Sequence, residues 1–175
     1  MNYLDNPFVW LYRFRHRCGY GVHSPFAYHF LSDVVYERTP YNLYQDLDGS
    51  LPLSEHFRVR KILHLLLRIS NWWQPDTIVA PDMVERYWDY LHAGCVRAHR
   101  RESLSGEGRT VCFLNHPKDG FQKHINADTV LVMDDFRKNR DWFFSLPTVL
   151  TFDLYDVGIA FFDPKYNKQD YIVNF

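Results

Sequence analysis

The chain has 175 residues, of which 46% are apolar and 23% charged, and its formal net charge is −1. This length fits one domain with its own core. The near-neutral charge gives no general attraction to nucleic acid or to an anionic membrane, so we expect neither as a partner. Three well-separated cysteines do not form a disulfide framework, and no basic leader precedes an apolar run. We therefore expect reduced thiols and a cytoplasmic protein.

The N-terminal part of the chain, residues 1–75, predicts a helical segment. Ser24 followed by Pro25 is a helix start, because the serine hydroxyl can cap the first turn and proline suits its first position. Gly19 and Gly21 favour a chain break just before it. The predicted helices cover 5–17, a stretch after Ser24 that runs past Val34, and 54–73, with a loop over 38–53.

The remaining part, residues 76–175, predicts an α/β sheet core in the same single domain. Short β-branched and aromatic runs predict strands at 77–80, 110–114, 129–135, 148–153, 157–162 and 171–175. The first three are apolar almost throughout, as strands buried on both faces are. The last three follow each other with short links, so we expect them to pair antiparallel. Helices are predicted at 82–101 and 137–146.

Five stretches, in this order, carry a resemblance to a known family: "GVHSPFAYHFL", "WWQPDTIV", "VLVMDDF", "TFDLYDVGIAFF" and "QDYIVNF". They resemble a family of SAM-dependent methyltransferase-like proteins from Bacteroidetes, over residues 10–80 and 128–175, and "GVHSPF" is the most specific of them. The resemblance implies a Rossmann-like methyltransferase fold with strand order 3-2-1-4-5-7-6 and strand 7 antiparallel.

The middle of the chain is short for that fold. Residues 81–128 would have to hold strands 2, 3 and 4, yet they offer one clear helix, one clear strand and a polar loop. We therefore expect a truncated Rossmann-like fold with a mixed sheet of five to six strands. Its order would be 1-4-5-7-6 with "YIVNF" added, and strand 1 would lie at the edge or under the N-terminal helices.

The resemblance also implies how a cofactor would bind: a glycine-rich turn after strand 1 and an acidic residue at the end of strand 2. At the first place this chain has Ala80, Pro81 and Asp82, and proline has no amide hydrogen. For the second, Glu102 lies in a stretch typical of a solvated loop. We expect weak or absent SAM affinity and no cofactor; if SAM does bind, Ala80, Asp82 and Asp134 are the expected contacts.

A divalent metal is the other cofactor considered. Asp134 and Asp135 end a buried-looking strand, where open α/β sheets place ligand groups, and Asn115 follows the preceding strand. Metal-dependent O-methyltransferases of similar fold use acidic positions there, and such an oxygen-rich set suits magnesium. The alternative is that one aspartate caps the following helix and Asn115 shapes a turn.

Two further groups of residues have both a functional and a structural interpretation. His92, Cys95 and His99 would share one face of a helix over 82–101, either as part of a zinc site or as an ordinary half-buried face. The basic run with Arg97, Arg100 and Arg101 is typical of a solvated helix end, or of a nucleic-acid patch if aromatic residues adjoin it.

Two functions remain open. The first is a degenerate methyltransferase-like domain, a pseudoenzyme that acts as a binding or interaction module. Its contact surface would be the aromatic N-terminal segment or an exposed sheet edge, for a protein partner or a second copy of the chain. The second is an active small SAM-dependent O-methyltransferase, with or without metal assistance. The sequence assigns no catalytic residue.

Overall fold

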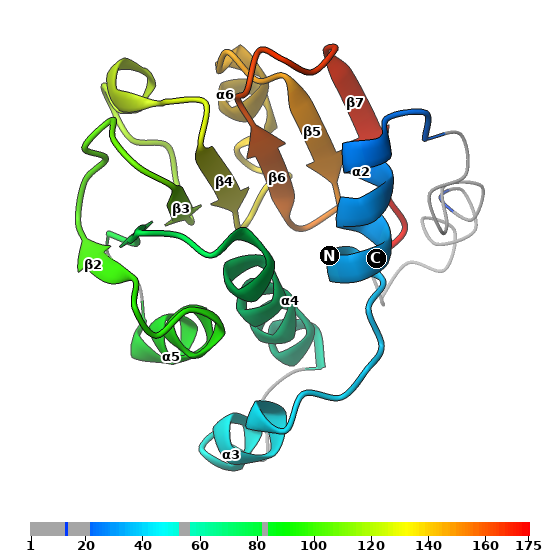
Figure 1. Ribbon diagram of the computed structural model, residues 1–175, viewed down its shortest axis with the longest axis vertical. Coiled ribbons are helices and arrows are strands. Elements are labelled where there is room, and N and C mark those ends of the chain that lie inside the picture. Colours follow the sequence, from blue (N-terminus) through cyan, green and yellow to red (C-terminus); the bar gives the residue numbers. More distant parts are fainter. Residues whose placement is uncertain (1–12, 14–21, 53–56, 82–83) are drawn as a thin grey trace.

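The residues that the structure describes form an α/β fold with a seven-stranded mixed sheet and five α-helices, consistent with a Rossmann-like architecture (Figure 1). The computed structural model describes residue 13 and residues 22–52, 57–81 and 84–175. The helix predicted over 5–17 therefore lies outside the described residues, apart from Arg13.

The sheet has the order β2-β1-β3-β4-β6-β5-β7. Strand β6 runs antiparallel to both of its neighbours, and all other neighbouring pairs are parallel. The run β1-β3-β4-β6-β5 confirms the predicted order 1-4-5-7-6. The strands are β1 (Thr77–Val79), β2 (His99–Arg101), β3 (Thr110–Leu114), β4 (Thr129–Met133), β5 (Leu150–Asp153), β6 (Gly158–Phe161) and β7 (Gln169–Ile172).

Two expectations about the sheet were wrong. Strand β1 is not an edge, because β2 pairs with it in parallel, which also brings the strand count to seven. Strand β7 does not pair antiparallel with β6 but lies parallel to β5. The reason is that β4 and β5 already occupy both sides of β6, so the last strand pairs with the free side of β5. Strands β2 and β7 lie at opposite margins of the sheet in Figure 1.

Helices α4 and α6 end at or next to the predicted residues 73 and 146, whereas α5 and α6 begin three residues after the predicted residues 82 and 137. The Ser24 cap is confirmed, since its Oγ accepts a hydrogen bond from Ala27 N at 3.4 Å. A short helix, α3, occupies part of the predicted loop. The elements are α2 (Pro25–Phe30), the π-helical turn η3 (Leu31–Val35), α3 (Leu43–Gly49), α4 (Phe57–Trp73), α5 (Glu85–Gly94), the 3₁₀ turn η4 (Phe121–His124) and α6 (Arg140–Ser145).

Helix α5 ends at Gly94, not at residue 101 as predicted. A Cβ atom at Gly94 would lie 2.4 Å from the carbonyl oxygen of Leu67, so only glycine lets α5 lie this close to α4. The next residue, Cys95, has an extended backbone with φ −150°. The chain is therefore free to form the short strand β2.

The sheet is covered on both faces. One core joins α2, α4 and α5 to alternate strand residues such as Ile78 and Val111, and a second core joins η4 and α6 to the residues between them, such as Val79 and Cys112. Strands β1, β3 and β4 are buried along their whole length, as predicted. Cys95 and Cys112 are free and buried. Within the described residues, no helix has the length and apolar character that crossing a membrane requires.

The loop from β2 to β3 crosses the second face of the sheet. Leu104 packs against the core that contains Val79 and Cys112. At the end of the loop, Arg109 N donates to Asp76 Oδ2 at 3.0 Å, which leads the chain back to the start of the sheet. Within the described residues, no strand pairs with the outer side of β2.

Candidate functional site

The carboxyl ends of β1, β3 and β4 form the candidate site. Between β1 and β3 the order of the strands reverses, and open α/β sheets bind ligands in the crevice at such a point. Ala80 follows β1, Asn115 follows β3 and Asp134 follows β4. The structure thus brings these predicted site residues to one edge of the sheet, while Asp82 lies outside the described residues.

The turn after β1 has little to offer a ligand. Ala80 is 3% exposed, and its amide already donates to the carbonyl oxygen of Arg101 at 3.2 Å. Pro81 has no amide hydrogen. Neither of the first two positions after β1 therefore provides a free backbone donor, which is what a glycine-rich cofactor turn supplies. The residues at this turn do not fit SAM in the way that the resemblance implies.

Glu102 lies in a different position from the one the sequence suggested. It directly follows β2, and because Val79 pairs with Arg101, Glu102 is level with Ala80 at the carboxyl edge. An acidic residue at the end of strand 2 is the second cofactor feature that the resemblance implies. Gly94 is the residue from which this position can be inferred in the sequence. A glycine near the end of a helical pattern favours a helix end, so the residues after Gly94 need not be helical.

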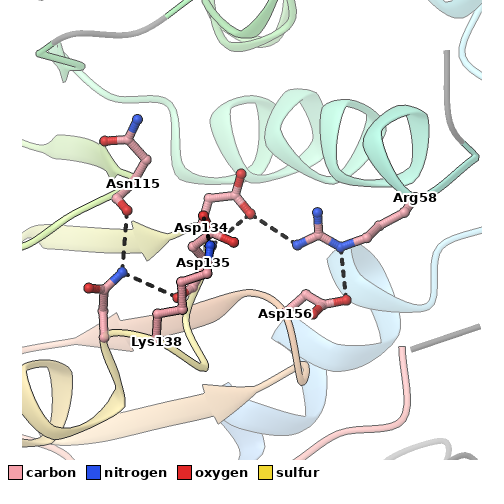
Figure 2. A network of polar contacts seen from close by, with 7 residues as sticks. Arg58, Asn115, Asp134, Asp135, Lys138 and Asp156 are labelled. Atoms are coloured by element: carbon pink, nitrogen blue, oxygen red, sulfur yellow. Dashed lines mark hydrogen bonds and ion pairs between the residues drawn. The ribbon is translucent and has the colours of Figure 1, made fainter. Parts of the chain in front are cut away.

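Arg58 joins the ends of β4 and β5 across the site (Figure 2). Its Nε donates to Asp156 Oδ2 at 2.8 Å, and its Nη2 donates to Asp134 Oδ1 at 3.2 Å. The three side chains are 24%, 19% and 16% exposed, respectively. The residues come from the first turn of α4, the loop between β5 and β6, and the residue after β4. No local sequence pattern indicates this bridge, because Arg58 and Asp134 lie 76 positions apart.

Burial and charge shift the pKa of Arg58 and of Asp134 in this bridge. Burial disfavours the charged form of Arg58, but Asp156 and Asp134 outweigh it and raise the pKa of its guanidinium. Burial raises the pKa of Asp134, although Arg58 acts in the opposite direction. Burial and the charge of Asp134 also raise the pKa of Tyr87. Asp134 is thus a part-buried carboxylate whose ionised form Arg58 stabilises against the effect of burial.

The three residues considered for a metal site have separate partners. Asp134 accepts from Arg58, Asp135 pairs with Lys138 at 3.1 Å, and the side-chain oxygen of Asn115 contacts His116 Nδ1. Asn139 Nδ2 donates to the main-chain oxygens of Asn115 and Asp135 at 3.3 and 3.2 Å (Figure 2). Their oxygens therefore do not converge, and the set does not fit a divalent cation as it stands. Neither aspartate caps α6, whose N-cap position is Asn139.

The proposed zinc ligands do not share a helix face. His92 Nε2 lies 3.0 Å from the carbonyl oxygen of Val96, and the thiol of Cys95 donates to the carbonyl oxygen of Pro75 at 3.4 Å. His99 lies in β2. Among the residues that the structure describes, no group of three histidine, cysteine or acidic side chains could hold a metal ion. The helical interpretation of 95–101 was wrong because α5 ends at Gly94.

A buried ion cluster lies at the end of β5. Asp153 is 3% exposed and accepts from Arg13 at 2.6 Å and from Arg140 at 2.6 Å. Burial disfavours its ionised form, but Arg13 and Arg140 outweigh it and hold the pKa of Asp153 below its ordinary value. The cluster ties the side chain of Arg13 and the start of α6 to the sheet. Sequence reasoning could not find it, since its members are far apart in the chain.

A third polar cluster holds α3 to α4 and α5. Asp48 accepts from the hydroxyl of Tyr90 at 2.5 Å, and His64 Nε2 lies 2.9 Å from its Oδ1. The His64 ring stacks on Tyr44, with ring centroids 3.8 Å apart. Burial disfavours ionised Asp48, but the hydrogen bonds from Tyr90 and His64 outweigh it and lower its pKa. We call Asp48, His64 and Tyr90 the α3 latch.

Comparison of the chain with protein families, with curated proteins and with solved structures gave no match. The resemblance to methyltransferase-like proteins therefore stays a prediction.

Proposed function

We propose that the chain is a methyltransferase-like domain that does not transfer methyl groups and acts as a binding or interaction module. The observation that carries the proposal is the turn after β1. The amide of Ala80 is bonded within the sheet, and Pro81 has no amide hydrogen. A SAM site of the kind implied by the resemblance would lack its backbone donors at this point.

The Arg58 bridge supports the same proposal. It ties α4 to the ends of β4 and β5 and pairs the carboxylate of Asp134 with a guanidinium. A ligand that bound Oδ1 of Asp134 would have to displace Arg58 and leave its part-buried charge without this partner, which is unfavourable. The carboxyl edge of the sheet is thus organised by internal contacts.

Isothermal titration calorimetry with SAM and with its demethylated product tests the proposal. We expect no binding of either compound at micromolar concentration. For scale, a dissociation constant of about 1 µM corresponds to about 8 kcal/mol of binding free energy. Micromolar binding of either compound would overturn the proposal. Pro81→Gly serves as a comparison, because a large gain in affinity on this change would identify the proline as the residue that blocks the site.

The second candidate function is an active small SAM-dependent O-methyltransferase. The observation that favours it is Glu102, which is level with Ala80 at the end of β2, where the resemblance implies a carboxylate for the ribose hydroxyls. If this function holds, Glu102→Gln weakens SAM binding while Glu107→Gln, a nearby exposed change, leaves it unaltered. Replacing Asp134 and Asp135 with asparagine would test the metal-assisted version, since retained methyl transfer would remove any metal role for them.

A further inference from the structure

We propose that the outer edge of β2 binds an acidic, extended peptide segment of a partner protein, which adds to the sheet as a further strand. This inference rests on the proposed function as an interaction module, and the outer edge of β2 is the docking surface of that module. Strand β2 ends the sheet, and its outer side pairs with no strand in the described part of the chain.

The backbone of β2 has one residue turned outward. His99 N donates to Asp76 O, and Arg101 O accepts from Ala80 N, so His99 and Arg101 face β1. In a parallel ladder the residue between them turns its amide and carbonyl to the other side. Arg100 therefore offers both a donor and an acceptor at the open edge, as a strand-adding peptide requires.

The side chains of this edge select the partner by charge. His99, Arg100 and Arg101 are all exposed, and so is Arg97, which the buried Ala98 separates from them. Two copies of β2 placed edge to edge would bring like charges opposite each other, which is unfavourable. The same charges are complementary to a strand that carries carboxylates. The edge thus disfavours a second copy of the chain and favours an acidic segment.

Arg100 is held in place for this role. Its guanidinium lies over the ring of Trp88 at 5.1 Å, and its Nη1 lies 3.2 Å from Glu85 Oε2. Glu85 is 68% exposed, and such surface ion pairs contribute little to stability. An incoming carboxylate can therefore replace Glu85 at small cost, while the indole keeps Arg100 positioned.

A nucleic acid fits this surface less well than a peptide. Aromatic residues do adjoin the basic run, since Arg100 lies over the ring of Trp88. A phosphate backbone, however, has no amide to pair with the carbonyl of Arg100. An extended peptide supplies both backbone groups.

The test uses fluorescence anisotropy with a short labelled peptide that alternates glutamate and valine. We expect saturable binding that weakens by at least about tenfold when Arg97, Arg100 and Arg101 are changed to glutamate. The matched control changes three exposed lysines elsewhere, Lys123, Lys138 and Lys168, to glutamate and should leave binding within about twofold. Equal loss in both triple variants would overturn the proposal.

A second pair of variants separates strand addition from simple charge attraction. Arg100→Ala removes the side chain, and Arg100→Pro also removes the outward amide without breaking a bond to β1. We expect Arg100→Pro to bind about fivefold more weakly than Arg100→Ala, with melting temperatures alike. Equal binding of the peptide by the two variants would overturn strand addition. Strand addition would also be overturned if single-stranded oligothymidylate bound the protein as tightly as the peptide does and if Arg100→Pro left that binding unchanged.

Titration of the same protein with SAM distinguishes the failure of the proposed function from the failure of the proposed docking surface at β2. Peptide binding without SAM binding supports both. Micromolar SAM binding together with peptide binding overturns the loss of cofactor binding but leaves the edge of β2 as a docking surface. Absence of both kinds of binding overturns the docking surface alone.

Discussion

Two regions near opposite margins of the sheet, one at β5 (the β5 end) and one at β1 (the β1 end), are stabilised by different kinds of contact. At the β5 end, the buried carboxylate of Asp153 lies between Arg13 and Arg140. At the β1 end, α4 and α5 pack together closely at Gly94, and the polar contacts of Asp48 are part-exposed. The comparison indicates that stability depends on charge at one end of the sheet and on shape at the other, so different substitutions should disturb each end.

The largest effect is expected for Asp153→Asn. This change removes the charge that balances Arg13, which is 7% exposed, and leaves a buried cation without its partner. We expect a loss of about 3–5 kcal/mol in the free energy of unfolding, measured by urea denaturation. Asp141→Asn, an exposed change in α6, is the control. A loss below about 1 kcal/mol would show that charge is not what holds the β5 end.

Gly94→Ala tests the β1 end. The added methyl group would lie 2.4 Å from Leu67 O and 2.8 Å from Ser70 Cβ, so α4 and α5 must move apart. We expect a loss of about 1–3 kcal/mol, even though alanine favours helices. Gly49→Ala is the matched control, since nothing lies within 4 Å of its added Cβ. Equal effects of the two changes would contradict a shape-dependent contact.

Arg58→Met tests the link between the two ends. Loss of the guanidinium leaves Asp134 part-buried without its counter-charge, and we expect a loss of about 1–3 kcal/mol at neutral pH. Burial already raises the pKa of Asp134, and the variant raises it further. Because the folded state then binds a proton more tightly than the unfolded state, the stability of the variant falls as pH rises. Denaturation at pH 7 and at about pH 4 should show the larger defect at pH 7, and the reverse order would contradict the bridge.

The smallest effect is expected for Asp48→Asn in the α3 latch, about 1 kcal/mol at neutral pH. The lowered pKa of Asp48 means that its contribution is present above the ordinary value of 3.8 and is lost as pH falls through the lowered value. The variant should therefore lose less stability on acidification than the parent chain. Asp46→Asn, an exposed change in the same helix, gives the baseline in thermal melts from neutral to acidic pH.

Sequence patterns predicted the parts of the fold that local chemistry decides. The apolar runs of β3 and β4 indicated buried strands, and Ser24 with Pro25 indicated a helix start. Strand β2 was missed because its three residues are basic and exposed, without an apolar pattern. Helix α3 was missed because its polar residue Asp48 finds its partners, His64 and Tyr90, only in the folded chain.

The candidate site was less predictable than the fold. Ala80, Asn115 and Asp134 were placed at one edge because they follow neighbouring parallel strands. Their partners could not be foreseen, since Arg58 reaches Asp134 across 76 positions of sequence and Arg13 reaches Asp153 across 140. Helix and strand periodicities carry no information on such long-range pairs.

The route of the loop over 102–109 has a consequence for how this chain can be enlarged. The loop begins after β2, which is the strand at the margin of the sheet, and leads to β3 on the other side of β1. Its Leu104 packs against the core that contains Val79 and Cys112. An additional strand and helix inserted at the exposed Ser103 would be able to pair with the outer edge of β2, and the existing strands would keep their order. This position is thus the natural insertion point for grafting new sequence onto the scaffold.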